Sequence, residues 1–250
     1  MAKTFDALMK AEKENKTRPG ETSAFDSTSS HRPYMPSGFK LPSQVEEEYH
    51  RMKYQIISSG SEGRIKTILF SSSSEGEGNS TVIINFAITL ASEGENVLLV
   101  DANLRSPALH DMFSLDKKGG LTELLMGDSS LNDVIKKTTL DNLSVITSGI
   151  PNSNPSTTFA SRSLDSSLEQ MKLQADWVLF DSPPITPYND SRVLATKMDG
   201  VVMVVQAEKT RWEVAQSAKD KITGYEKIKI LGAVLNRRQM HIPAWAYKLL

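Results

Sequence analysis

The sequence contains no cysteine, which excludes disulfide bonds and thiolate metal sites and says little about the compartment. It also lacks any apolar run approaching the ~20 residues of a membrane-spanning helix. The N-terminus lacks the apolar core of a signal peptide. We therefore expect a cytoplasmic protein, whose association with the inner membrane would come through a partner or a short amphipathic segment.

An excess of charge of either sign is missing as well. The 29 lysines and arginines face 30 aspartates and glutamates, which gives a net charge of −1. No overall field favours nucleic acid or anionic lipid, and we predict no nucleic-acid partner. With 39% hydrophobic and 24% charged residues, the 250-residue chain has the composition of a soluble globular protein and the length for one α/β domain and a tail.

Composition divides the chain into three parts. Residues 1–43 combine a short N-terminal helix with a linker rich in Ser, Thr, Pro and charge, which cannot bury enough apolar surface to fold. Residues 44–236 form the predicted domain, and residues 237–250 form a C-terminal tail. The tail, with Trp245 and Tyr247, could dock on a partner or a membrane surface, but we favour packing on the domain.

Within the domain, apolar runs alternate with segments of helical spacing. The runs are continuous, which is typical of strands covered on both faces and predicts an α/β fold with a mainly parallel sheet sandwiched between helices. The predicted strands are 65–70, 96–101, 143–147, 177–181, 200–205 and 228–236. The predicted helices are 46–57, 82–90, 121–126, 131–136, 163–173 and 211–223.

Residues 72–81, Ser-Ser-Ser-Glu-Gly-Glu-Gly-Asn-Ser-Thr, lie between the first predicted strand and the helix that follows it. A strand, a Gly-rich turn and a helix N-terminus together form a phosphate-binding loop, because backbone N–H groups converge and the helix dipole favours an anion. Asn79 stands where such a loop normally carries its lysine. The sequence therefore keeps the phosphate cradle and lacks the positive charge.

Two aspartates follow predicted strands of the same sheet. Ligands bind at the carboxyl ends of parallel strands, so Asp101, Asp181 and the loop residue Ser80 are candidate Mg²⁺ ligands. Asp101 is also a candidate base. The alternative is that each aspartate only caps a turn or a helix.

These motifs resemble, in order, those of the bacterial tyrosine kinases of capsular and exopolysaccharide synthesis, in the MinD-like branch of P-loop ATPases. The matching segments are 75–81 (Walker A), 97–107 (Walker A′), 120–127, 154–155, 181–184 (Walker B) and 234–236. The resemblance implies a P-loop fold that binds ATP or ADP with Mg²⁺.

The resemblance also implies roles for individual residues. The nucleotide-binding residues would be Gly76, Glu77, Gly78, Asn79, Ser80, Thr81 and, at the adenine, Asn236. Asn103 and Arg105 would belong with Asp101 to the catalytic Walker A′ segment. The implied partners are a membrane chain-length regulator of polysaccharide export or an active kinase paralogue.

Several positions depart from the family pattern. Asn79 replaces the P-loop lysine, and Asn103 replaces the second Walker A′ aspartate. The family's Glu-x-x-Arg-x-x-Arg oligomerisation helix becomes Glu47, His50 and Lys53 within the predicted helix 46–57, which could instead be a solvated charged face. The C-terminal tyrosine cluster is absent from the last stretch.

Three functions follow from this pattern. The departures favour a kinase-like nucleotide-binding scaffold that is weakly active or inactive. The retained Ser80, Asp101 and Asp181 support an active ATP-dependent tyrosine autokinase. A MinD-like positioning ATPase is less favoured, because its loop would carry a second lysine near position 74, where this chain has Ser74.

Overall fold

The computed structural model describes residues 41–59, 65–150, 154–224 and 228–238. The predicted helix within residues 1–14, most of the predicted linker and nearly all of the tail lie outside the described residues. The described part spans most of the predicted domain, whose boundaries stay a prediction.

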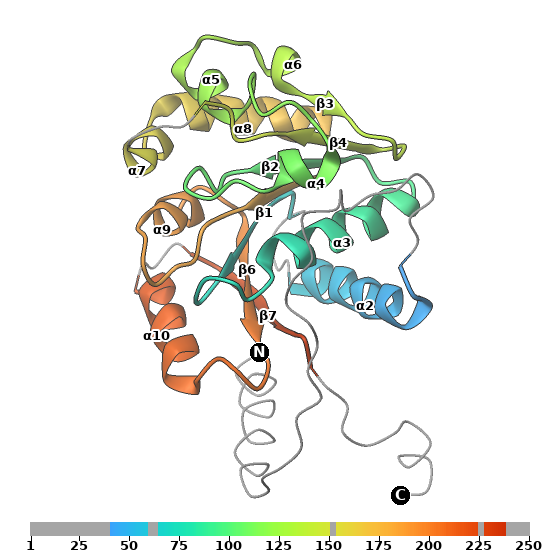
Figure 1. The fold of residues 1–250 in the computed structure, drawn as a ribbon, viewed down its shortest axis with the longest axis vertical. Helices are drawn as coiled ribbons and strands as arrows, with labels where there is room; N and C mark the ends of the chain where they lie inside the picture. Colours follow the sequence, from blue (N-terminus) through green and yellow to red (C-terminus); the bar gives the residue numbers. More distant parts are fainter. Residues whose placement is uncertain (1–40, 60–64, 151–153, 225–227, 239–250) are drawn as a thin grey trace, which may run out of the picture. The chain divides into compact units, whose positions relative to one another are not determined.

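Seven strands form one sheet in the order β3-β4-β2-β5-β1-β6-β7 (Figure 1). The strands are β1 (Thr67–Ser72), β2 (Val97–Asp101), β3 (Lys136–Lys137), β4 (Leu143–Ile146), β5 (Trp177–Asp181), β6 (Gly200–Gln206) and β7 (Ile230–Asn236). All neighbouring pairs are parallel except β3 with β4. The predicted mainly parallel α/β fold is confirmed.

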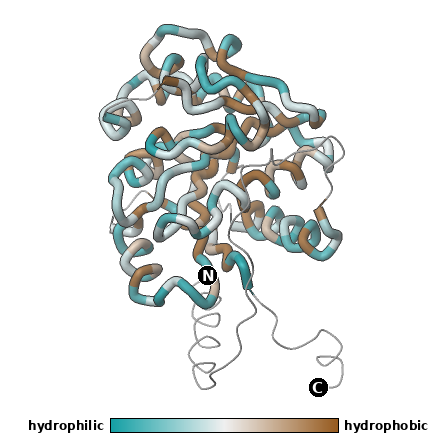
Figure 2. The backbone as a smooth tube through the Cα atoms, in the orientation of Figure 1, coloured by the Kyte–Doolittle hydropathy of each residue, from teal (hydrophilic) through white to brown (hydrophobic). Residues whose placement is uncertain are grey.

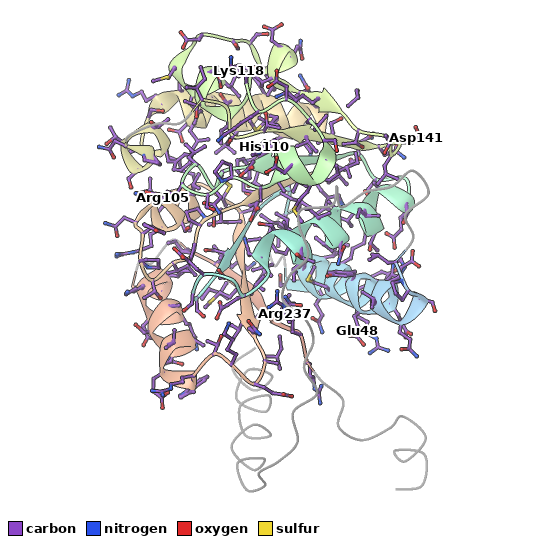
Figure 3. The ribbon with its side chains drawn as sticks, in the orientation of Figure 1. Glu48, Arg105, His110, Lys118, Asp141 and Arg237 are labelled. Atoms are coloured by element: carbon purple, nitrogen blue, oxygen red, sulfur yellow. The ribbon has the colours of Figure 1, made fainter. Side chains whose placement is uncertain are left out.

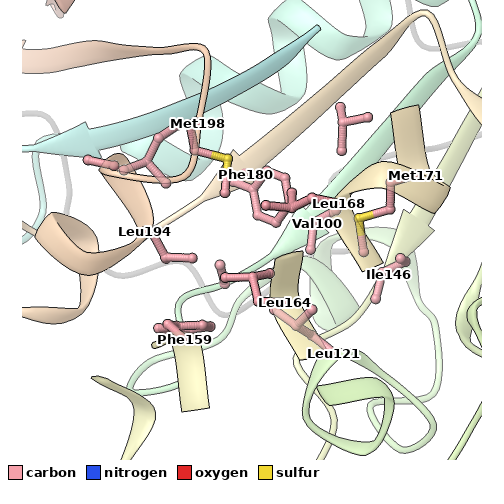
Figure 4. Packing of buried hydrophobic residues seen from close by; sticks show 14 of the residues in the cluster. Val100, Leu121, Ile146, Phe159, Leu164, Leu168, Met171, Phe180, Leu194 and Met198 are labelled. Carbon is pink, nitrogen blue, oxygen red and sulfur yellow. The ribbon is translucent and has the colours of Figure 1, made fainter. Parts of the chain in front are cut away.

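Helices cover both faces of the sheet. They are α2 (Ser43–Ser59), α3 (Asn79–Ser92), α4 (Leu109–Phe113), α5 (Leu121–Met126), α6 (Leu131–Val134), α7 (Pro155–Phe159), α8 (Arg162–Gln174), α9 (Asp190–Ala195) and α10 (Trp212–Thr223). Strand residues alternate between two apolar clusters: Leu69 packs with the helices from α5 to α10, whereas Ile68 and Phe70 pack with α2, α3 and α4. Figure 4 shows the first cluster around Phe180, and Figure 2 shows the apolar residues that lie along the strands.

The structure corrects some local predictions. The predicted helix 131–136 ends at Val134, because Lys136 and Lys137 pair with β4 as a short antiparallel strand. Helices α4, α7 and α9 were not predicted. Each has only five or six residues, which is too short for an apolar periodicity to be seen.

Candidate functional site

The loop between β1 and α3 has the conformation of a phosphate cradle. Gly76 and Gly78 adopt left-handed φ angles of 77° and 88°. A Cβ atom on Gly78 would lie 2.3 Å from Asn236 Nδ2, which donates a 2.8 Å hydrogen bond to the Glu77 carbonyl. Glycine is therefore required both by the backbone angle and by the close approach of β7.

Asn79 is the first residue of α3, and its side chain is buried against the ends of β1 and β5. Its Nδ2 donates to Asp181 Oδ1 at 2.6 Å and to the Phe70 carbonyl at 3.0 Å. Its Oδ1 is buried and accepts no hydrogen bond from the described residues. A neutral amide thus occupies the position next to the Walker B carboxylate that the motif assigns to an ammonium group.

Ser80 and Asp181 meet directly, as the predicted Mg²⁺ site requires. Ser80 Oγ donates to Asp181 Oδ2 at 2.6 Å, although the two residues are 101 positions apart. Asp101 ends the neighbouring strand β2 and lies opposite Asp181 in the β2–β5 ladder. The sheet therefore brings both aspartates and the loop serine to one place.

The two aspartates are fully buried, and this raises their pKa values. Burial raises the pKa of Asp181 to about 6, although hydrogen bonds from Ser80 and Asn79 oppose the shift. Burial and repulsion from Asp181 raise the pKa of Asp101 well above its usual range. Two buried carboxylates this close repel each other when both are ionised, and a divalent cation or a proton would relieve the repulsion.

The donor set fits Mg²⁺, which prefers oxygen ligands and usually keeps water or phosphate oxygens in its shell. Asp101, Asp181 and the Ser80 hydroxyl are the residues that would hold it. The described residues contain no group of three or more His, Asp or Glu side chains arranged for a metal. The remaining ligands would therefore come from water and from the phosphates of a nucleotide.

Asp101 also has a structural role that matches the alternative prediction of a cap. Its Oδ2 accepts hydrogen bonds from the N–H groups of Ala108 and Leu109 at 3.1 Å, where α4 begins. Its Oδ1 accepts one from the Asn103 N–H at 3.2 Å. Asp101 thus fixes the turn that follows β2 while lying beside Asp181, and its role as a base stays a prediction.

The structure separates Arg105 from this carboxylate pair. Arg105 Nε donates to Asp190 Oδ2 at 2.5 Å, and its guanidinium lies 4.3 Å from the centre of the Tyr188 ring. Tyr188 also donates to Glu75 Oε1 at 3.2 Å, so it connects the Walker A′ segment to the tip of the P-loop (Figure 3 labels Arg105). Ser156 completes the set by donating to Asp190 Oδ1.

This network was missed by the sequence analysis. Asp190, Tyr188 and Ser156 belong to no motif quoted there, and they meet Arg105 only through the fold. The one available signal was polar residues in the segment that follows the Walker B strand. Asn103 was predicted in the same segment as Arg105, and its Oδ1 accepts a hydrogen bond from the Ser106 N–H, which shapes the turn.

Glu77 and Asn236 both serve the shape of the loop. The Glu77 carboxylate is buried and accepts hydrogen bonds from the N–H groups of Ser73 and Ser74 at 2.7 and 3.0 Å and from the Thr210 hydroxyl. Asn236 Oδ1 accepts from the Arg237 N–H while its Nδ2 binds the loop. Their predicted contacts with a nucleotide, and those of Thr81, stay predictions.

Two residues of α2, His50 and Lys53, contact acidic residues of their own domain. Lys53 binds Glu93 and Glu95, at the C-terminal end of α3, with distances of 2.5 and 2.7 Å, and His50 also pairs with Glu93. These contacts dock α2 onto its own domain. Glu47 pairs with Arg51 of the same helix and its side chain is 64% exposed, so the oligomer contact and the solvated face both stay predictions.

Comparisons with known proteins show which family this chain resembles. A family model described as an AAA domain matches residues 65–224. Tyrosine-protein kinase YwqD of Bacillus subtilis is 33% identical over 194 residues, covering 78% of this chain and 81% of YwqD. The putative tyrosine-protein kinase CapB of Staphylococcus aureus is 32% identical, covering 79% of this chain and 86% of CapB.

Solved structures show the same relation. The chimerical protein CapA2B2 superposes with a TM-score of 0.74 at 29% identity, covering 78% of this chain and 85% of the chimera. MinD of Pyrococcus horikoshii with Mg-ADP gives a TM-score of 0.59 at 23% identity, covering 73% of this chain and 76% of MinD, which supports the fold alone.

The strand order and the loop thus define a P-loop fold of the MinD-like kind. Within that class, the chain belongs to the bacterial tyrosine kinase family. In the described part of the chain, no helix has the length and apolar character needed to cross a membrane.

Proposed function

We propose that this protein binds adenine nucleotide with Mg²⁺ but transfers phosphate weakly or not at all. The observation that carries the proposal is the Asn79 amide on Asp181, in the place of the P-loop lysine. Backbone N–H groups of residues 76–81 and the N-terminus of α3 would hold the phosphates, since neither depends on side-chain charge. Bound Mg²⁺ would supply charge neutralisation, with Ser80 and Asp181 as its protein ligands.

The missing charge acts mainly on catalysis. A lysine neutralises the charge that develops on the transferred phosphoryl group, whereas an amide offers only a dipole. Loss of one comparable transition-state contact lowers the rate by ~10²–10³. Binding should therefore survive the replacement much better than turnover does.

The proposed biological role is a scaffold in capsule or exopolysaccharide synthesis. It would regulate a membrane chain-length determinant or an active kinase paralogue, and nucleotide occupancy would set its conformation. Assembly into a homo-oligomer through residues 46–57 would need contacts other than His50 and Lys53, because both are paired within the chain.

An active tyrosine autokinase is the second candidate, and the direct Ser80–Asp181 contact beside Asp101 favours it. Calorimetric titration with Mg-ATP and Mg-ADP, followed by a phosphotyrosine assay on the same sample, separates the two. Binding without phosphotyrosine supports the scaffold. Strong phosphotyrosine on Tyr188, Tyr225 or Tyr247 supports the kinase, and absence of any binding contradicts both.

A further inference from the structure

Four exposed cations gather where β6 and β7 end, next to the P-loop. Lys209 and Arg211 follow β6, and Arg237 and Arg238 follow β7 (Figure 3 labels Arg237). The two segments leave the sheet together, because Gln206 lies opposite Asn236 in the β6–β7 ladder and the Ala207 N–H donates to the Asn236 carbonyl at 2.9 Å. We call these four residues the basic corner.

The charges of the basic corner are not neutralised within the described residues. None of the four side chains forms an ion pair or a hydrogen bond there, whereas Lys53 and Arg105 are paired with carboxylates. The same segments carry two exposed acids, Glu208 and Glu213, so cations are in excess by two. The nearby Glu77 is buried and binds its own loop.

An exposed aromatic side chain lies within the same surface. Trp212 directly follows Arg211 at the start of α10, and it is 39% exposed. Tryptophan is enriched at membrane–water interfaces, where its ring sits at the level of the headgroups. An exposed tryptophan beside unpaired cations suits an anionic lipid surface better than an acidic protein surface or nucleic acid.

The chain that continues from the basic corner has the same character. Residues 239–250 contain no aspartate or glutamate and carry one lysine, Lys248. Beyond Arg238 they add Trp245, Tyr247 and two terminal leucines. Basic and aromatic residues without acids favour binding to the surface of an anionic bilayer.

We propose that the basic corner binds anionic lipid headgroups directly, so that the protein reaches the membrane surface without a partner. The net charge of −1 does not oppose this, because charges are screened over about 8–10 Å and the local excess decides. Thr210 and Asn236, which contact Glu77, would lie beside the lipid-binding surface. This goes beyond the proposed nucleotide function and does not depend on it.

Sedimentation of the nucleotide-free full-length protein with vesicles tests the proposal. The vesicles contain phosphatidylcholine alone or with one third phosphatidylglycerol. We expect binding only to the second kind and release at high salt. Each cation near an anionic surface contributes about fivefold in affinity. Replacing all four (K209Q, R211Q, R237Q, R238Q) should therefore weaken binding at least tenfold.

A matched variant controls for net charge. Lys117, Lys118, Lys137 and Arg162 lie near β3 or on α8, toward the other end of the strand order, and their replacement by Gln removes the same charge. This control should keep wild-type binding within about twofold, since β3 and α8 lie away from the ends of β6 and β7 (Figure 1). The pair R237Q and R238Q alone, on exposed positions, keeps the test valid if the fourfold variant unfolds.

Three results would overturn the proposal. The first is wild-type protein that ignores the anionic vesicles. The second is an equal loss of binding in the control variant. The third is wild-type retention on polyglutamate or nucleic acid with no binding to vesicles, which would assign the surface to an acidic protein or a nucleic acid.

Discussion

Asn79 stands where the family motif carries a lysine, and the proposed loss of activity depends on this residue. Replacing it with lysine (N79K) would place an ammonium group beside Asp181, where the amide now donates at 2.6 Å. Because this charge stabilises the transition state, we expect ATP hydrolysis to rise by ~10²–10³. A steady-state hydrolysis assay with Mg-ATP measures the change.

The control for N79K is N79Q, which keeps the residue neutral and lengthens it. Any gain that comes from length alone would appear in both variants. If N79K hydrolyses ATP no faster than the wild type, the missing charge is not what limits turnover.

Asp181 also links stability to pH. Its folded pKa of about 6 is higher than the ~3.9 of an unfolded aspartate, so the folded state holds the proton to higher pH. This contribution is fully present below about pH 4 and is lost as pH rises through 6. Between these limits we expect the free energy of unfolding of the wild type to decline by about 2–3 kcal/mol. We expect D181N to lack this decline.

Urea unfolding at several pH values, without Mg²⁺, measures this difference between wild type and D181N. The comparison is needed because Glu123 and Asp199 have lowered pKa values and shift stability in the opposite sense. Parallel pH profiles for the two proteins would contradict the assignment.

At the scale of elements, the P-loop depends on β7. Ala at Gly76 meets no atom within 4 Å, whereas Ala at Gly78 meets Asn236 Nδ2, and both positions have left-handed φ. G76A should cost ~1–2 kcal/mol in unfolding free energy from the backbone angle alone. G78A should cost ~1 kcal/mol more, because Asn236 must release the Glu77 carbonyl.

Thermal and urea unfolding of G76A and G78A provide the test, with G76A as the matched control. In an N236A background, G76A and G78A should cost nearly the same, since the side chain that collides and its hydrogen bond to the Glu77 carbonyl are absent from the reference protein as well. Equal costs for the two single variants would show that the contact with β7 does not contribute to the free energy of unfolding.

The sequence predicted the elements that are long and buried, because their physical signal is local. The run 200–205 and the helix 163–173 match β6 and α8 within one or two residues. The sequence could not predict which side chains pair, because the partners lie far apart in the chain. Asn79 and Asp181 are 102 positions apart, and Lys53 and Glu93 are 40 apart. The buried Glu77 carboxylate also accepts a hydrogen bond from Thr210, in a loop that only the sheet order brings near.

At the scale of the whole domain, the Arg105 network joins segments that the chain keeps far apart. It connects the turn after β2, the P-loop tip, α7 and α9 through Arg105, Tyr188 and Asp190. Asp190 is the buried member, with a side chain 1% exposed, whereas Arg105 is 39% exposed. The network therefore holds the carboxyl edge of the sheet together around a buried carboxylate.

The variant R105M tests how strongly the stability of the domain depends on the Arg105–Asp190 pair. The variant keeps apolar contact with Tyr188 but leaves Asp190 buried without its cation, and breaking a buried pair costs ~3–5 kcal/mol. Because Arg105 is partly solvated, we expect a cost below this range, about 1–3 kcal/mol. R162M, an exposed arginine on α8, is the control and should change the unfolding free energy by less than ~0.5 kcal/mol. A loss in R105M no larger than that in R162M would show that the pair of Arg105 with the buried Asp190 contributes little to stability.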